Sequence, residues 1–267
     1  MTAYYQFVSQ QINEDGSCTS HYIPTIHSQG AWNTHEQHMA PASGILAHEL
    51  ERFNPHDHMR IGRISFDIFG IIHLAPFTIT TRVIRPGKTI ELIEATMQAQ
   101  GKTCIVARAW RMMTQNSRVI HGIEDDVIYT PSELPNWEGM KRWPGGFIQS
   151  IQLRVAPEHR PGKGIVWITT AKSLVEGQSS SDFARLMGLV DTANGIVPRQ
   201  EGSFDWAFPN LDLQIHMYRL PSGSWLGLET IQQYGSDGIG LTSSVLHDIH
   251  GPFGRSEQIL TLRPMNR

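Results

Sequence analysis

Residues 209–263 read PNLDLQIHMYRLPSGSWLGLETIQQYGSDGIGLTSSVLHDIHGPFGRSEQILTLR, and their pattern is the main indication of the fold. Apolar and polar residues alternate along it in successive runs, which are separated by turn sequences rich in Gly, Pro, Ser and Asp. Alternation with a period of two residues, bounded by such turns, is typical of antiparallel strands joined by hairpins. We therefore predict a run of antiparallel strands from residue 209 to residue 263.

The same succession of strands and turns occurs earlier in the chain, over residues 61–112. The two closing hairpins align without a gap, so that Gly101 corresponds to Gly251 and Arg108 corresponds to Gln258. A unit that recurs at a fixed offset indicates an internal duplication, which has to be recognised before the fold is assigned. We therefore predict two copies of one structural unit.

One helical segment precedes each run of strands. In residues 40–53 and 181–194, apolar side chains recur every three or four residues, which is the spacing of a helix face. The first face consists of Ala42, Leu46, Leu50 and Phe53, and the second of Phe183, Leu186, Met187 and Val190. Two strand-like stretches precede each helix, so each unit reads as two strands, one helix and four strands.

This order predicts an α+β protein with two antiparallel sheets, each wrapped around one long helix. A parallel sheet is excluded, because it would need a helix after nearly every strand. Residues 131–146, PSELPNWEGMKRWPGG, are rich in Pro, Gly and Trp and lack periodicity, which is typical of a linker. We therefore predict an N-terminal half at residues 1–130, a linker at 131–146 and a C-terminal half at 147–267.

The composition of the chain argues against several classes of partner. Its 267 residues carry a formal net charge of −3, and no basic run is long enough to indicate nucleic acid or a membrane surface. The two cysteines do not form a disulfide framework and suit a reducing compartment. We find neither a signal peptide nor an apolar stretch that could span a bilayer, so we expect a cytoplasmic protein.

Asp191 is the most informative residue of the sequence. It lies eight positions after Phe183 and four after Met187, so it falls on the apolar face of the second helix. A carboxylate on a buried face is costly unless a partner satisfies it, and burial raises its pKa toward values that suit proton transfer. The alternative is an open helix end at which Asp191 is solvated or caps a loop. Periodicity alone does not choose between these two interpretations.

Two amides and the histidines complete the set of candidate residues. Gln258 in the last strand could orient a water molecule, although an exposed strand residue is the simpler interpretation. Asn210 follows Pro209, a frequent position for a turn asparagine. His35 and His38 in HEQH lack the HExxH spacing of zinc proteases, so we expect surface or turn histidines and no metal site. Motifs for serine hydrolysis and for nucleotide binding are absent.

Taken together, these stretches resemble a known family, the type II acyl-CoA thioesterases and their thioesterase-like relatives, which have a double hot-dog fold. The resemblance rests on the approach from Trp32 to His38, ISFDIF with the RVIRPGK turn, LMGLVDTANGIVP, LDLQIHMYRLPSGSWLGLE, and the closing strand that carries Gln258. It covers most of the chain, and it is the order of these stretches that carries it, because none is specific alone.

The resemblance implies an active site. In this family an Asp, a Thr or Ser, and a Gln hold the attacking water, and the corresponding positions here are Asp191, Asn210 and Gln258. Asn210 departs from the family pattern because it has no hydroxyl group. The first half has Glu51 loosely at the position of Asp191, but Arg108 in place of Gln258, so we predict one competent site per chain, in the second half.

The implied activity is hydrolysis of acyl-CoA or a similar acyl thioester. Coenzyme A would be part of the substrate, no other cofactor is expected, and the family's tendency to associate further allows a homodimer. Two alternatives remain open at this point. One is a binding protein without hydrolytic activity, which the Asn210 departure motivates. The other is a hot-dog hydratase or dehydratase, which would need a His beside Asp191, and no His lies near Asp191 in the sequence.

Overall fold

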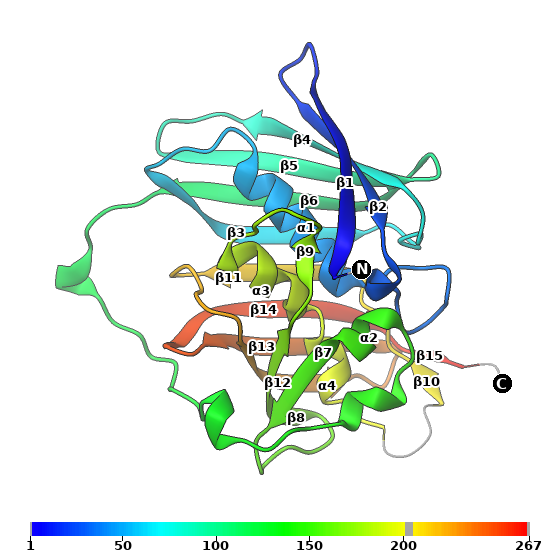
Figure 1. The fold of residues 1–267 in the computed structure, drawn as a ribbon. Coiled ribbons are helices and arrows are strands. Elements are labelled where there is room, and N and C mark those ends of the chain that lie inside the picture. The colour runs from blue at the N-terminus through cyan, green and yellow to red at the C-terminus, as the bar shows by residue number, and fades with distance from the viewer. Residues whose placement is uncertain (1, 201–204, 266–267) are drawn as a thin grey trace.

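The computed structural model describes residues 2–200 and 205–265 (Figure 1). The first part of the chain contains one long helix among six strands, in the predicted order. Its elements are β1 (Ala3–Ile12), β2 (Cys18–Pro24), α1 (Met39–Arg52), β3 (Met59–Ile68), β4 (Phe77–Arg85), β5 (Ile90–Ala99) and β6 (Lys102–Met113), with short 3₁₀ helices η1 (Ile26–Ser28) and η2 (Arg118–Ile120).

The second part repeats this plan with additional short elements. It contains η3 (Pro131–Glu133), η4 (Gly139–Arg142), α2 (Gly146–Ser150), β7 (Ile151–Val155), β8 (Lys163–Thr170), β9 (Ser173–Val175), α3 (Asp182–Val190), α4 (Ala193–Ile196), β10 (Trp206–Ala207), β11 (Asp212–Met217), β12 (Leu226–Tyr234), β13 (Ile239–Asp248), β14 (Gly251–Thr261) and β15 (Arg263–Pro264). The predicted second helix is thus divided into α3 and α4. The division of the chain into residues 1–130, 131–146 and 147–267 stays a prediction.

The prediction of one sheet for each half is wrong, because the long strands of both halves join in one sheet, and of the described strands only the short β10 and β15 pair apart from it. In the described residues the strand order is β7-β8-β12-β13-β14-β11-β3-β6-β5-β4-β2-β1-β9. The halves meet where β3 pairs with β11, with Ile64 opposite Ile215 and Phe66 opposite Leu213. Each half would otherwise expose an edge strand with unpaired backbone groups, and the pairing satisfies them. Alternation in the sequence identifies strands but not the neighbour of an edge strand.

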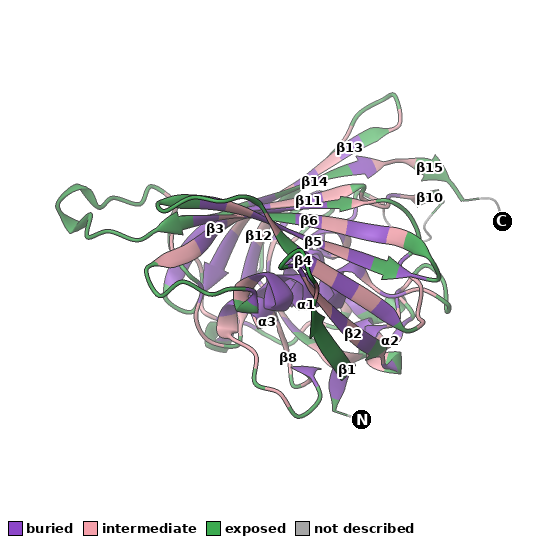
Figure 2. Cartoon of the chain, turned by 90° about the horizontal axis from the view of Figure 1, so that it is seen from above, coloured by how far each residue is buried: buried purple, intermediate pink, exposed green. Residues whose placement is uncertain are grey.

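The sheet curls until its two ends come close together. The strands β8 and β9 follow one another in sequence, yet β9 pairs in parallel with β1 at the far end of the strand order. Near this seam the Tyr4 hydroxyl lies 2.7 Å from Ser150 Oγ and 3.0 Å from Thr170 Oγ1. The sheet therefore curves around the two central helices, α1 and α3. Figure 2 shows α1 and α3 on its concave side, coloured as buried residues.

The two central helices cross at a pair of glycines. Both sit at the contact between α1 and α3, and a Cβ atom built on Gly44 would lie 2.7 Å from the Cα atom of Gly188. A Cβ atom built on Gly188 would lie at an ordinary 3.4 Å from the Cα atom of Gly44. The close approach brings the end of each helix near the start of the other, and this crossing positions the candidate site described below.

We expect Gly44→Ala to destabilise the protein by about 1–3 kcal/mol, because the added methyl group meets backbone atoms that cannot turn away. The matched variant is Gly188→Ala, whose methyl group has room. Because alanine favours a helix interior over glycine by about 1 kcal/mol, Gly188→Ala should be neutral or slightly stabilising. Urea denaturation of both variants measures the difference. Equal stabilities of the two variants would contradict the asymmetry of the crossing.

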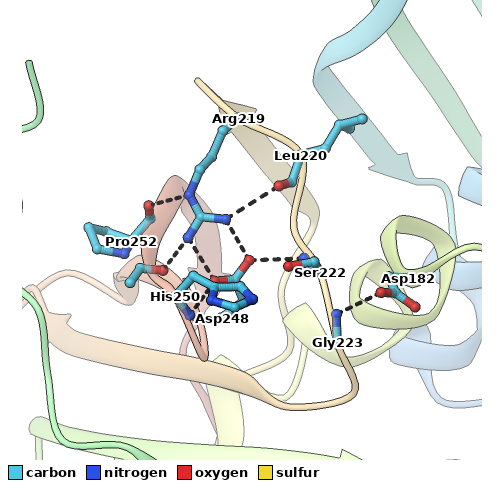
Figure 3. Close-up of polar contacts among 9 residues, drawn as sticks. Asp182, Arg219, Leu220, Ser222, Gly223, Asp248, His250 and Pro252 are labelled. Carbon is cyan, nitrogen blue, oxygen red and sulfur yellow. Dashed lines mark hydrogen bonds and ion pairs between the residues drawn. The ribbon is translucent and has the colours of Figure 1, made fainter. Parts of the chain in front are cut away.

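A partly buried ion pair ties the loop after β11 to the end of β13, and the same loop contacts the start of α3 (Figure 3). Arg219 donates to both carboxylate oxygens of Asp248, at 2.5 and 2.7 Å, and Ser222 N–H donates to the same carboxylate at 2.9 Å. The next residue, Gly223, donates its N–H to Asp182 in the first turn of α3 at 2.6 Å. This chain of contacts holds α3 against the hairpin between β13 and β14.

None of the helices in the described residues combines the length and the apolar composition that crossing a bilayer requires.

Candidate active site

Asp191 lies directly after α3 and is turned into the protein, as helical periodicity predicts. Helix α3 ends at Val190, Asp191 is its C-cap residue, and α4 begins at Ala193. The residue is only 5% exposed. Its environment therefore matches the buried interpretation and excludes the solvated helix end.

Both candidate amides converge on one oxygen of this carboxylate. Asn210 Nδ2 and Gln258 Nε2 each donate to Asp191 Oδ1 at 2.9 Å. Asn210 precedes β11, and Gln258 comes from the inward face of β14, where it is 1% exposed. Since Oδ1 accepts both bonds, Oδ2 is the oxygen that remains for chemistry.

A histidine that the sequence analysis assigned to the surface or to a turn faces the second oxygen. His38 Nδ1 lies 3.4 Å from Asp191 Oδ2. The expectation of a surface or turn residue is wrong for His38, because it is the N-cap of α1 and its side chain is 16% exposed. Its ring packs on Phe147 with the centroids 4.4 Å apart. Positions 38 and 191 are distant in sequence, so only the crossing of α1 and α3 brings them together.

The protonation of His38 follows from its contacts. Its Nδ1 accepts a hydrogen bond from the Ala40 backbone N–H at 3.0 Å, so the ring carries its proton on Nε2 when neutral. Burial lowers the pKa of His38 to about 4. At neutral pH the pair is therefore a neutral imidazole beside a carboxylate, and no charge-assisted bond joins them.

The pKa of Asp191 is shifted in the opposite direction, upward. Burial, which disfavours the charged form, raises the pKa of Asp191 to about 6, although the hydrogen bonds from Asn210 and Gln258 stabilise the carboxylate and act against this rise. The group is then ionised at neutral pH but close to its titration range. A general base works best in that range, because it is free to accept a proton and basic enough to hold it.

Asp191 opens into a cavity of about 450 Å³ that both halves of the chain line. His38, Asp191 and Asn210 are among its lining residues, whereas Gln258 lies behind them. The other walls are mostly apolar and consist of residues from the approach to α1, the end of β3, η4, and the segment before β11. A concave, mostly apolar pocket with a few convergent polar groups is typical of a small-molecule site.

The first half does not reproduce this arrangement. Glu51 accepts a hydrogen bond from Ser181, the N-cap of α3, at 2.5 Å. Arg108 instead bonds Glu94 at 2.9 Å, with its own side chain 47% exposed. In residues 2–200 and 205–265 no three His, Cys, Asp or Glu side chains gather as ligands for a metal ion. One competent site per chain stays a prediction.

Comparison with known families identifies the chain. The acyl-CoA thioesterase N-terminal domain matches residues 28–112, and the acyl-CoA thioesterase C-terminal domain matches residues 131–262. The chain belongs to the acyl-CoA thioesterase family. The resemblance inferred from the sequence is thus confirmed. No curated protein shows significant sequence similarity to this thioesterase-family chain.

Solved structures share the fold at low sequence identity. A hot-dog protein of unknown function from Alicyclobacillus acidocaldarius is 12% identical, with a TM-score of 0.74 and 97% of each chain covered. The acyl-CoA thioesterase II TesB2 from Mycobacterium marinum is 13% identical, with a TM-score of 0.66, covering 97% of this chain and 96% of its own. The dehydratase domain of PpsC from Mycobacterium tuberculosis is 13% identical, with a TM-score of 0.55, and the match covers 96% of this chain and 98% of that domain. These likenesses confirm the hot-dog fold.

Proposed function

We propose that this chain hydrolyses the thioester bond of acyl-CoA or a related acyl thioester, with Asp191 as the general base. The observation that carries the proposal is that the two oxygens of the buried Asp191 carboxylate have different surroundings. Two amides hold Asp191 Oδ1 and leave Oδ2 for proton transfer, and Asp191 lines a cavity large enough for a substrate. The family membership of both halves points to the same class of reaction.

The reaction would begin with a water molecule between Asp191 Oδ2 and the thioester carbonyl carbon. Asp191 takes a proton from this water as the new carbon–oxygen bond forms. The carbonyl oxygen becomes an oxyanion, which the N-terminus of α1 at Met39 would stabilise through its backbone N–H and the helix dipole. The intermediate then expels the thiolate, to which Asp191 returns the proton. Coenzyme A is part of the substrate, and we propose no other cofactor.

The amides serve the carboxylate more directly than the water. The family resemblance implies that the middle residue holds the attacking water, but Asn210 donates to Asp191 Oδ1 and to the Asp212 carbonyl, at 2.9 and 3.0 Å. A hydroxyl group could supply only one such bond, so asparagine is a competent replacement for fixing the carboxylate. Gln258 Oε1 is buried with no partner among the described residues, and it can accept a hydrogen bond from a water molecule.

The test is thiol release from a panel of acyl-CoA thioesters, followed from pH 4.5 to pH 9. We expect hydrolysis whose kcat/KM is level above pH 7 and falls toward tenfold per pH unit below about pH 6, where Asp191 becomes protonated. His38 should cause no second change in kcat/KM within this pH range, because its pKa is about 4. Tight acyl-CoA binding without thiol release at any chain length would contradict hydrolysis and favour a binding protein.

A second candidate function follows from the position of His38. Hydration of an enoyl thioester needs two proton-transfer groups on one substrate, and His38 Nδ1 lies 3.4 Å from Asp191 Oδ2. We nevertheless favour hydrolysis, because Nδ1 also accepts the Ala40 N–H and leaves only Nε2 for a substrate. Loss of the enoyl-CoA absorbance without thiol release would identify a hydratase. Thiol release from saturated acyl-CoA would identify a hydrolase.

A further inference from the structure

Three aromatic rings from separate segments form one wall of the cavity that holds Asp191. Trp32 precedes α1, Trp143 follows η4, and Phe208 lies before β11, and all three line the cavity. Their ring centroids are 5.2 Å apart for Trp32 and Trp143, 5.7 Å for Trp32 and Phe208, and 5.9 Å for Trp143 and Phe208. We call these three residues the aromatic wall.

The rings pack against one another and leave no space between them for a ligand. All three pairs have edge-to-face geometry at the distances of ordinary aromatic contacts. A cage for a cation would need the rings spaced around a bound group, each within about 6 Å of the charge. The aromatic wall is therefore a continuous surface, and a ligand packs against it.

The aromatic wall is anchored to the residues of the candidate site. The Phe208 carbonyl accepts a hydrogen bond from Asn194 Nδ2 at 3.0 Å, and Asn194 lies in α4, immediately after the turn that carries Asp191. Phe208 is also two positions before Asn210. Phe208 is 1% exposed and Trp32 is 39% exposed, so the wall runs from the interior toward solvent. A group bound against the wall would be held close to the carboxylate.

We propose that the acyl group accepted here carries an aromatic ring, which is held against the aromatic wall. This inference rests on the proposed function. The cavity volume of about 450 Å³ is within the usual range for a small-molecule site and has room for a ring.

Ring chemistry explains the expected preference for an aromatic group. An aromatic pair in edge-to-face or offset contact gains a factor of about two to ten in binding beyond the apolar area that it buries. An alkyl chain of the same carbon number buries similar area but lacks this contribution. It also loses more rotational freedom on binding than a flat ring does. The two effects act in the same direction.

The experiment compares kcat/KM for phenylacetyl-CoA, octanoyl-CoA and palmitoyl-CoA, the first two having equal numbers of acyl carbons. For the unaltered chain we expect kcat/KM for phenylacetyl-CoA to exceed that for octanoyl-CoA by about two- to tenfold, and to exceed that for palmitoyl-CoA as well. Trp143→Leu should remove the phenylacetyl preference and improve octanoyl-CoA relative to it. Trp32→Leu, at a partly exposed position where folding is less at risk, should reduce the preference in the same way.

Trp110→Leu is the matched control, because Trp110 lies outside the cavity and contacts Arg85. It should leave the substrate ratio unchanged. A preference for octanoyl-CoA or palmitoyl-CoA in the unaltered chain, or an equal change of the ratio in Trp110→Leu and Trp143→Leu, would overturn the inference.

Binding to Asp191→Asn separates this inference from the proposed function. If the unaltered chain cleaves no thioester, the proposed hydrolytic function is wrong. The Kd values of Asp191→Asn for phenylacetyl-CoA and octanoyl-CoA, measured by calorimetry, still test whether the aromatic wall prefers an aromatic acyl group. Tighter binding of phenylacetyl-CoA supports the aromatic wall. Equal or weaker binding of phenylacetyl-CoA overturns it.

Discussion

Asp191→Asn is expected to lower thioester hydrolysis by about 10²–10⁴-fold, the usual contribution of a positioned general base. The loss should appear in kcat, because the substitution removes proton transfer and keeps the shape of the cavity. Thiol release from acyl-CoA measures it at pH 8. The control is Asp57→Asn, an exposed aspartate in the loop after α1, which should retain full activity. Unchanged hydrolysis by Asp191→Asn would remove the proposed mechanism.

The same variant should keep the fold and gain stability at neutral pH. The carbonyl oxygen of the introduced asparagine can accept the bonds from Asn210 and Gln258, and its amide can point toward His38 Nδ1. The buried charge is then gone. A folded pKa of about 6, raised from 3.8, means that ionising Asp191 in the folded state costs ~3 kcal/mol above pH 7.

The sign of this effect gives it a characteristic pH dependence. Because the folded pKa is raised, the contribution of Asp191 to stability is fully present below pH 3.8 and is lost as the pH rises through about 6. The asparagine side chain of the variant does not titrate. The free energy of unfolding of the variant should therefore match that of the original chain near pH 4 and exceed it at pH 8 by up to ~3 kcal/mol. If the difference in free energy of unfolding between the variant and the original chain were smaller at pH 8 than at pH 4, the burial of Asp191 would be contradicted.

Arg219→Met is expected to destabilise the protein by about 3–5 kcal/mol, the cost of leaving a buried charge without its partner. The Asp248 side chain is 0% exposed. Burial is the largest single influence on this carboxyl and acts to raise its pKa, but Arg219 and the backbone N–H groups of Ser222 and His250 outweigh it and hold the pKa of Asp248 below its usual range. Without the guanidinium, burial dominates.

Two further variants test this interpretation by urea denaturation. Arg255→Met breaks the pair with Asp125 on the surface, where Arg255 is 60% exposed, and should cost about 0–1 kcal/mol. Combining Arg219→Met with Asp248→Asn removes the buried charge and should recover part of the loss. If Arg219→Met cost no more than Arg255→Met, the ion pair would not be what holds the loop after β11. If the stability lost in Arg219→Met came from packing of the Arg219 side chain and not from charge, the double variant would show no recovery.

Most local features of this protein could be predicted from residue patterns. Alternation identified the strands from residue 61 to residue 112 and from 209 to 263, and spacing identified both long helices. The same spacing placed Asp191 on a buried face, because a helix turns each residue by a constant angle. Asn210 and Gln258 were harder, since each has an ordinary interpretation as a turn or strand residue. Only the resemblance to the family connected them with Asp191.

Residue patterns were enough to identify the main strands and helices and to place Asp191 on a buried face. Three features could be seen only in the tertiary structure. The strands β3 and β11 join two half-sheets into one, both amides donate to Asp191 Oδ1, and His38 faces Oδ2. Periodicity reports on contacts within an element, which repeat every few residues. Edge pairing, desolvation and hydrogen-bond partners arise between elements that are distant along the chain, so they depend on how α1 and α3 cross inside the curled sheet.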